Sequence, residues 1–246
     1  MAKIFRYELK RMLFSKFYIA LLIINGAFAW FVLTTDIIAG VAFTAPFSFW
    51  SYGAYMATVM PMAMMTAMFL LSSYYSKNEK QVEVLTSATP VDEVKYMLVR
   101  NATVALGFLL LILTAILLSS YFYSTYFGYW NFGFLWIAVL TIMPGFVFFI
   151  GLGHWAGSVR TWFLYVLVPV TFAVGFLRHP IALDIYGGGY YSGFPLTLPV
   201  GADGEPAFVL SAVFLVTRAL YLIIGGACWL YALYKSCANK KAGSES

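Results

Sequence analysis

A long uncharged run, from Asn101 to Val159, constrains the fold more than any other feature of this sequence, because it contains no Asp, Glu, Lys or Arg. About 20 apolar helical residues cross a bilayer core of roughly 30 Å, so this run is too long for one crossing and has to turn back once. Residues 124–133 supply Gly, Asn and clustered aromatic side chains, as expected of a short turn among lipid headgroups. The run therefore predicts two antiparallel membrane spans joined by a tight hairpin.

Similar apolar runs along the rest of the chain predict an all-α, polytopic membrane protein. Its composition agrees, since 62% of the residues are hydrophobic and 10% are charged. The whole chain, 1–246, is expected to form one transmembrane domain with six spans, at residues 17–35, 51–75, 101–123, 132–153, 161–177 and 207–234. Residues 178–206 are rich in Gly, Pro and Tyr and are expected to form an external cap or a re-entrant element.

The basic residues indicate how these spans are oriented. Most Lys and Arg residues lie before the first span, between the second and third spans, between the fourth and fifth, and after the last. The positive-inside rule then places both termini in the cytoplasm, and the expected location is the cell membrane. The net charge of +5 follows from this topology and does not require a nucleic-acid partner.

Residues 1–16 have an amphipathic pattern. Phe5, Leu9 and Met12 recur at helical spacing, while Arg6 and Lys10 fall on other faces. This pattern predicts a helix that lies in the membrane interface and leads into the first span. The alternative is that these residues are the positive flank of a signal anchor.

The segment between the second and third spans, residues 76–100, is the most charged part of the chain. Thr89 can cap a helix, Pro90 is favoured at its first position, and Asp92 and Glu93 suit its positive start. A short amphipathic helix parallel to the membrane could dock in a groove of another protein. A solvated loop is the alternative interpretation of the same pattern.

Residues 79–91, EKQVEVLTSATPV, add a resemblance to this interpretation. The stretch resembles the cytoplasmic segment of the membrane subunit of type-2 ABC transporters, the ABC-2 type permeases, and it lies between the same two spans. In that family the segment forms a coupling helix that docks on a separate nucleotide-binding subunit. By this resemblance, Glu79 and Glu83 match the acidic positions and Thr89, Pro90 and Val91 match the turn. Exposure adds three further candidates for contact with the ATPase, which are Asp92, Glu93 and Tyr96.

The resemblance implies the transmembrane permease subunit of an ATP-driven exporter. It would work as a dimer with a second copy or a related permease, and two ATPase subunits would hold ATP and Mg. The chain contains no Gly-Lys dipeptide, which a phosphate-binding P-loop requires, so we expect no nucleotide cofactor on this chain.

The residue pattern offers no catalytic or metal site. No arrangement of Ser, His and acid suggests catalysis, so we expect the chain itself not to be an enzyme. His154 and His179 fall on opposite sides of the predicted membrane and would not share a metal ion.

Three side chains are candidates for the translocation pathway or its gating. Arg218 is the full charge deep in a predicted span, where it would contact the cargo, stabilise a closed state with an acid such as Asp184, or reach the outer interface. Met60 and Met64 belong to a methionine series in the second span. The series could offer an adaptable surface for cargo, pack ordinarily, or bind Cu(I).

The spans are apolar and aromatic, which favours a lipophilic or amphipathic cargo such as a drug, an antimicrobial peptide or a lipid. Two other classes remain open. One is the substrate-capturing membrane component of a small-molecule importer. The other is an ion channel or a regulatory membrane module.

Overall fold

The computed structural model describes residues 2–76, 93–130, 132–177, 180–201 and 204–244 of the chain. This described part is helical and contains no strand, which confirms the all-α prediction over those residues. Its α-helices are α1 (Ala2–Leu13), α2 (Lys16–Val32), α3 (Phe49–Tyr74), α5 (Glu93–Phe127), α6 (Leu135–Val159), α7 (Thr161–Phe176), α8 (Gly188–Gly193) and α9 (Ala212–Ser244). A π-helical turn, Leu33–Ile37, extends α2, and short 3-10 turns lie at Phe132–Phe134, Ile181–Leu183 and Phe194–Thr197.

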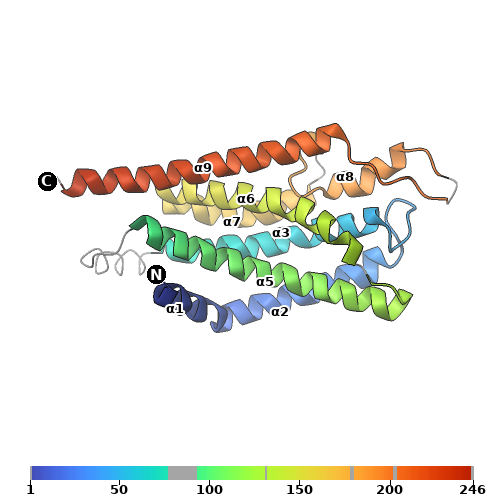
Figure 1. Cartoon of the computed structure of the whole chain (residues 1–246), viewed down its shortest axis with the longest axis horizontal. Coiled ribbons are helices and arrows are strands. Elements are labelled where there is room, and N and C mark those ends of the chain that lie inside the picture. Colours follow the sequence, from blue (N-terminus) through green and yellow to red (C-terminus); the bar gives the residue numbers. More distant parts are fainter. Residues whose placement is uncertain (1, 77–92, 131, 178–179, 202–203, 245–246) are drawn as a thin grey trace.

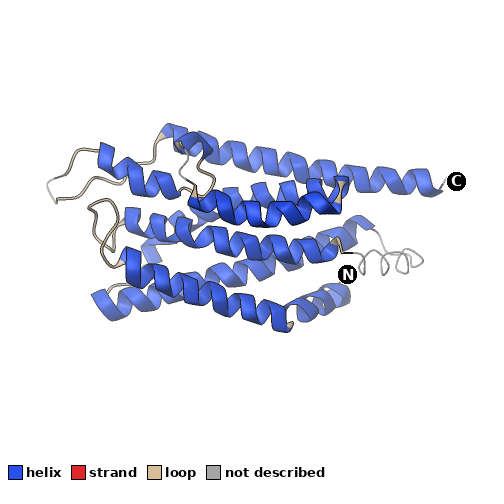
Figure 2. Ribbon diagram, turned by 180° about the vertical axis from the view of Figure 1, so that it is seen from behind, coloured by secondary structure: helices blue, strands red, loops and turns tan. Residues whose placement is uncertain are grey.

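The long helices run side by side along one axis of the molecule (Figures 1 and 2). One end, the terminal end, holds α1, the end of α9 and the helix ends that flank residues 77–92. The opposite end, the distal end, holds the α2–α3 loop, the α5–α6 turn and α8. Among the described residues, α2, α5 and α7 thus run from the terminal end towards the distal end, and α3, α6 and α9 run the other way.

Five of these helices are long and apolar enough to cross a membrane, and they span Lys16–Ile37, Phe49–Tyr74, Lys95–Phe127, Leu135–Val159 and Ala212–Lys235. The fifth expected span, residues 161–177, forms α7, which has 16 residues. At 1.5 Å per residue α7 is about 24 Å long, shorter than a bilayer core of roughly 30 Å. The chain leaves the helix at Leu177, whose backbone is extended.

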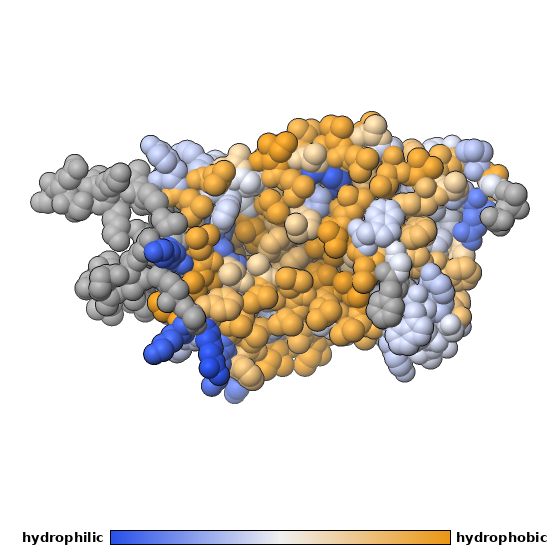
Figure 3. All heavy atoms as spheres, viewed as in Figure 1, coloured by the Kyte–Doolittle hydropathy of each residue, from blue (hydrophilic) through white to orange (hydrophobic). Residues whose placement is uncertain are grey.

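Helix α3 lies at the centre of the bundle and contacts α2, α5, α6, α7 and α8. Its methionine series is fully enclosed, and Met60 and Met64 both have 0% exposed surface. In contrast, many large apolar side chains of α2, α5, α7 and α9 are exposed on the outside. Figure 3 shows the resulting apolar band between the two more polar ends, as expected of a surface that faces lipid.

Glycine residues let two pairs of helices approach closely. A methyl group at Gly225 of α9 would lie 2.4 Å from the Val147 carbonyl oxygen of α6, and one at Gly151 of α6 would lie 2.0 Å from the Gly225 carbonyl oxygen. Helices α6 and α9 therefore touch through their backbones, as small residues allow in membrane proteins. In the same way Gly175 of α7 leaves space for the Pro61 ring of α3.

The N-terminal prediction is matched by a helix, α1, which is separate from α2. Ser15 caps α2, because its hydroxyl accepts a hydrogen bond from the Tyr18 N–H. Helix α1 packs against the bundle, with the end of Met12 close to Gly107 of α5.

The predicted separate helix ending at Arg100 differs from the structure. From Glu93 onward the chain belongs to α5, a single helix that continues to Phe127. No Gly or Pro lies within residues 93–106, so the helix begins before the apolar run and continues through it. The earlier part of the expected coupling segment, residues 77–92, lies outside the described residues.

Candidate functional site

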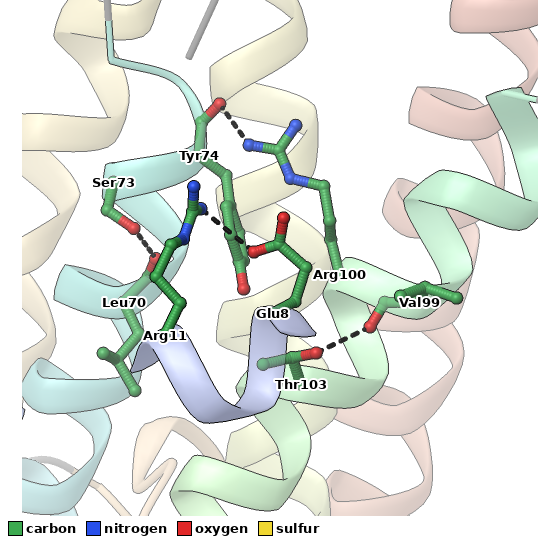
Figure 4. Close-up of polar contacts among 8 residues, drawn as sticks. All are labelled: Glu8, Arg11, Leu70, Ser73, Tyr74, Val99, Arg100 and Thr103. Carbon is green, nitrogen blue, oxygen red and sulfur yellow. Dashed lines mark hydrogen bonds and ion pairs between the residues drawn. The ribbon is translucent and has the colours of Figure 1, made fainter. Parts of the chain in front are cut away.

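A group of polar side chains, the terminal cluster, joins three helices at the terminal end. It consists of Glu8 and Arg11 of α1, Tyr74 of α3 and Arg100 of α5. The Arg11 guanidinium lies 3.0 Å from the Glu8 carboxylate, which is only 5% exposed. Figure 4 shows this carboxylate between Arg11 and Arg100. Charged groups of opposite sign are thus placed together where little water reaches Glu8.

Arg100 connects α5 to the end of α3. Its Nη2 donates a hydrogen bond of 2.9 Å to the Tyr74 carbonyl oxygen, and its guanidinium lies 4.2 Å from the centre of the Tyr74 ring (Figure 4). The same guanidinium lies 5.4 Å from the centre of the Tyr96 ring. Because guanidinium groups both donate to carbonyls and stack on aromatic rings, Arg100 holds the end of α3 and the first part of α5 together.

Tyr75, which directly follows α3, links the end of this helix to α6. Its hydroxyl lies 2.9 Å from Nδ1 of His154, a side chain with 3% exposure. The Tyr75 ring also lies over Gly157, where an added methyl group would be 2.7 Å from a ring carbon. The end of α3 is therefore fixed to α1, α5 and α6.

The expected coupling residues are placed only in part. Glu79, Glu83, Thr89, Pro90, Val91 and Asp92 lie outside the described residues. Glu93 is the first residue of α5, and the half-buried Tyr96 lies one turn further along. The terminal cluster was not predicted, because charge and periodicity do not show that Glu8 and Arg100 lie together.

At the distal end, Arg218 of α9 is buried with 2% exposure. Its Nη1 donates to the carbonyl oxygen of Ile185, and its Nη2 donates to that of Asp184 at 2.9 Å. The guanidinium also lies 4.4 Å from the centre of the Phe214 ring. Arg218 thus binds the backbone of the segment that follows α7, which we name the re-entrant loop, residues 180–194.

The carboxylate of Asp184 accepts hydrogen bonds from backbone N–H groups of the same loop. Its two oxygens accept hydrogen bonds from the N–H groups of Gly187, at 2.8 Å, and Tyr190, at 2.9 Å. Gly187 has a φ of 89°, a left-handed conformation that glycine adopts without strain. Arg218 therefore binds the backbone carbonyl oxygen of Asp184. The expected role of this pair in a closed state stays a prediction.

Three buried tyrosines anchor the re-entrant loop to the bundle. Tyr186 donates a hydrogen bond of 2.7 Å to the Thr171 carbonyl of α7, and its ring stacks on Phe149 of α6. The hydroxyls of Tyr191 and Thr141 are 2.9 Å apart. Burial raises the pKa of Tyr186 well above its usual value and that of Tyr191 to about 12, so both hydroxyls stay protonated at neutral pH.

The third tyrosine, Tyr190, ties the loop to the start of α9. Its hydroxyl donates to the Val209 carbonyl at 2.7 Å and accepts from the Ser211 N–H at 2.9 Å. On the other side, the Tyr191 ring rests against Gly53 of α3, where an added methyl group would lie 2.4 Å from the ring. The described chain after α7 is therefore attached to the bundle by these contacts, and the expected external cap or re-entrant element at residues 178–206 stays a prediction.

Helix α3 connects the two regions. Its distal part contacts the re-entrant loop at Gly53, and its terminal part holds Tyr74 and Tyr75. Met60 and Met64 lie between them in the packed core, which suits the packing interpretation of the methionine series. A single helix, α3, thus contacts side chains at both ends of the bundle.

No protein-family model, curated protein or solved structure matches this chain.

Proposed function

We propose that the chain is the transmembrane permease subunit of an ATP-driven exporter of the type-2 ABC kind. The terminal end would face the cytoplasm, and residues 77–92 with the start of α5 would dock on a separate ATPase subunit that carries ATP and Mg. A second copy or a related permease would complete the dimer. The cargo would be a lipophilic or amphipathic molecule such as a drug, an antimicrobial peptide or a lipid.

One observation supports this proposal most strongly, and it is the position of α3. This helix ends at Tyr74, with two residues between it and residue 77, is the most enclosed of the long described helices, and contacts the re-entrant loop at its other end. A displacement of residues 77–92 would therefore be transmitted along α3. The coupling residues inferred from the resemblance lie in the segment from which such a displacement would begin.

The contacts at the two ends give this motion a physical form. At the terminal end, Arg100 and His154 hold the end of α3 to α5 and α6, so these helices would respond together. At the distal end, Arg218 and the three loop tyrosines would keep the path closed until α3 moves. ATP binding to the partner would shift the balance between closed and open states by binding one of them more tightly.

Purification of the tagged chain from its native membrane tests the proposal. We expect a stoichiometric ATPase subunit to co-purify, and we expect the double substitution Asp92→Lys and Glu93→Lys to release it. The matched control is Asp36→Lys, a charge reversal at the exposed distal end of α2, which should leave the ATPase bound. A chain that purifies without any nucleotide-hydrolysing partner would contradict the proposal.

The same experiment separates the two alternatives. An ATPase that stays bound after the double substitution would favour the substrate-capturing component of an importer, which needs no coupling helix of its own. Ion currents through the purified chain in planar bilayers without nucleotide would favour a channel.

A further inference from the structure

A pocket of about 250 Å³ opens at the distal end between three segments of the chain. They are the start of α3 with the residues before it, the turn between α5 and α6, and residues 205–208 before α9. Six aromatic side chains line the pocket: Phe47, Phe49, Trp50, Tyr129, Phe134 and Phe208. Glu205 supplies the charged group in its wall.

The size of the pocket limits what it can hold. Pockets for drug-sized ligands typically measure about 300 to 1,000 Å³, so a volume of about 250 Å³ suits a smaller group. The faces of aromatic rings carry partial negative charge and attract cations. A pocket lined by several rings and a carboxylate is therefore suited to a small organic cation.

Glu205 retains an oxygen for such a cation. Its Oε1 accepts a hydrogen bond of 2.9 Å from the Ala45 N–H, which is the one hydrogen bond that this side chain makes with described residues. No Lys or Arg of the described ranges forms an ion pair with it. The N-terminus of α3 adds about half a positive charge nearby, which is less than the full negative charge of Glu205.

The residues that line the pocket also hold one another in place. The Trp50 indole donates a hydrogen bond of 3.2 Å to the Pro206 carbonyl and packs on the Phe208 ring at 4.7 Å. The Phe49 and Phe134 rings meet edge to face at 4.8 Å. Because these rings are already fixed, a ligand would lose little binding energy to ordering them.

We propose that this pocket binds the ammonium group of an organic cation of the choline type. The group belongs to a choline lipid headgroup or to a soluble quaternary ammonium compound, which share this chemistry. The proposal goes beyond the exporter function, since binding needs neither the ATPase nor transport.

Calorimetric titration of the full chain in phosphatidylglycerol nanodiscs tests the proposal. The probes are choline chloride and 3,3-dimethyl-1-butanol, a neutral molecule in which carbon replaces the choline nitrogen. We expect choline to bind at least about tenfold more tightly than the neutral molecule, because only choline carries the charge. Equal affinities, or no choline binding, would overturn the proposal.

Two variants locate the site. Glu205→Gln keeps an oxygen for the Ala45 N–H and removes the charge, so we expect choline affinity to fall about tenfold. Phe208→Leu removes one ring and should also weaken binding. Asp36→Asn removes a carboxylate at the same end outside the pocket and should bind as the unchanged chain does. Unaltered affinity in Glu205→Gln would overturn the assignment.

A parallel titration in phosphatidylcholine nanodiscs shows whether the bound ammonium group comes from a lipid headgroup or from a soluble cation. Weaker apparent choline binding there would show that lipid headgroups already occupy the pocket, whereas equal binding in both lipids would assign it to a soluble cation. Both results support an ammonium site. Failure of ATPase co-purification leaves this titration unaffected, so the two proposals are tested separately.

Discussion

Replacing Arg218 by Met should release the re-entrant loop while preserving a side chain of similar length. In the structure Arg218 donates to the carbonyl oxygens of Asp184 and Ile185, both within the loop. Methionine cannot donate a hydrogen bond, so both carbonyls would lose their partner in a place where Arg218 is 2% exposed. The perturbation therefore acts on the attachment of the loop and leaves the loop's own sequence intact.

The expected effect follows from the two lost hydrogen bonds. A buried polar group without a partner costs about 1–3 kcal/mol, so two carbonyls give about 2–6 kcal/mol. The substitution also removes the free-energy cost of burying a charge, which favours the lower end of this range. A loss of about 2 kcal/mol corresponds to roughly 30-fold more frequent opening of the loop.

Hydrogen–deuterium exchange measures this opening. The N–H groups of Gly187 and Tyr190, which Asp184 protects, should exchange roughly 30-fold faster in Arg218→Met, while amides in the centre of α3 keep their rates. The matched control is Lys235→Met on the same helix, because Lys235 donates to the Ser158 carbonyl at the terminal end. It should leave the loop unchanged.

Either of two results would refute this reasoning. Unchanged exchange at Gly187 and Tyr190 in a folded Arg218→Met variant would mean that the guanidinium does not hold the loop. Slower exchange, or a higher unfolding temperature, would mean that burying the charge costs more than its hydrogen bonds contribute.

Three further predictions concern packing, the terminal cluster and pH. Gly225→Ala should lower the free energy of unfolding by about 1–3 kcal/mol because the methyl group meets the α6 backbone, whereas Gly226→Ala, which has open space, should be neutral or stabilising in thermal unfolding. Arg100→Gln removes the bond to the Tyr74 carbonyl and should destabilise the half-exposed terminal cluster by about 1 kcal/mol, measured as a lower unfolding temperature; an unchanged temperature would contradict it. The Tyr191 hydroxyl, with a pKa of about 12 in the folded chain against 10.0 normally, should add stability that is fully present below pH 10 and lost as the pH rises through 12. In ultraviolet titration of the folded protein, Tyr191→Phe should match the unchanged chain near pH 10 and lack one tyrosinate only as the pH passes about 12; a missing tyrosinate that is already complete near pH 10 would contradict this.

The apolar runs predicted the helices well because a membrane core requires a minimum length of apolar helix. Their ends were less predictable. The fourth expected span stopped at Gly153, yet α6 continues to Val159, since neither Gly153 nor Gly157 breaks the helix when each faces a neighbouring side chain. The last expected span began at residue 207, yet α9 begins at Ala212 because the preceding residues bind Trp50 and Tyr190.

The candidate functional residues also divide into those that the sequence could predict and those that it could not. Arg218 could be found from the sequence because a charge within an apolar run is costly and needs a partner. The two carbonyl oxygens to which Arg218 donates could not be found in this way, since every residue has a carbonyl oxygen and the sequence does not mark which ones accept. His154 and Tyr75 are 79 positions apart, and only the parallel packing of α3 and α6 brings them together.

Because α6 and α9 meet at their backbones near Gly225, a tilt of α9 about this crossing would move the far end of the helix most. From this point the helix continues to Ser244, a length of about 28 Å at 1.5 Å per residue. A tilt of roughly 5° at the crossing would move the end of the helix by about 2.5 Å, a displacement large enough to break a hydrogen bond. Rotations too small to disturb the lipid-facing surface at the crossing would thus be amplified at the terminal end of the molecule.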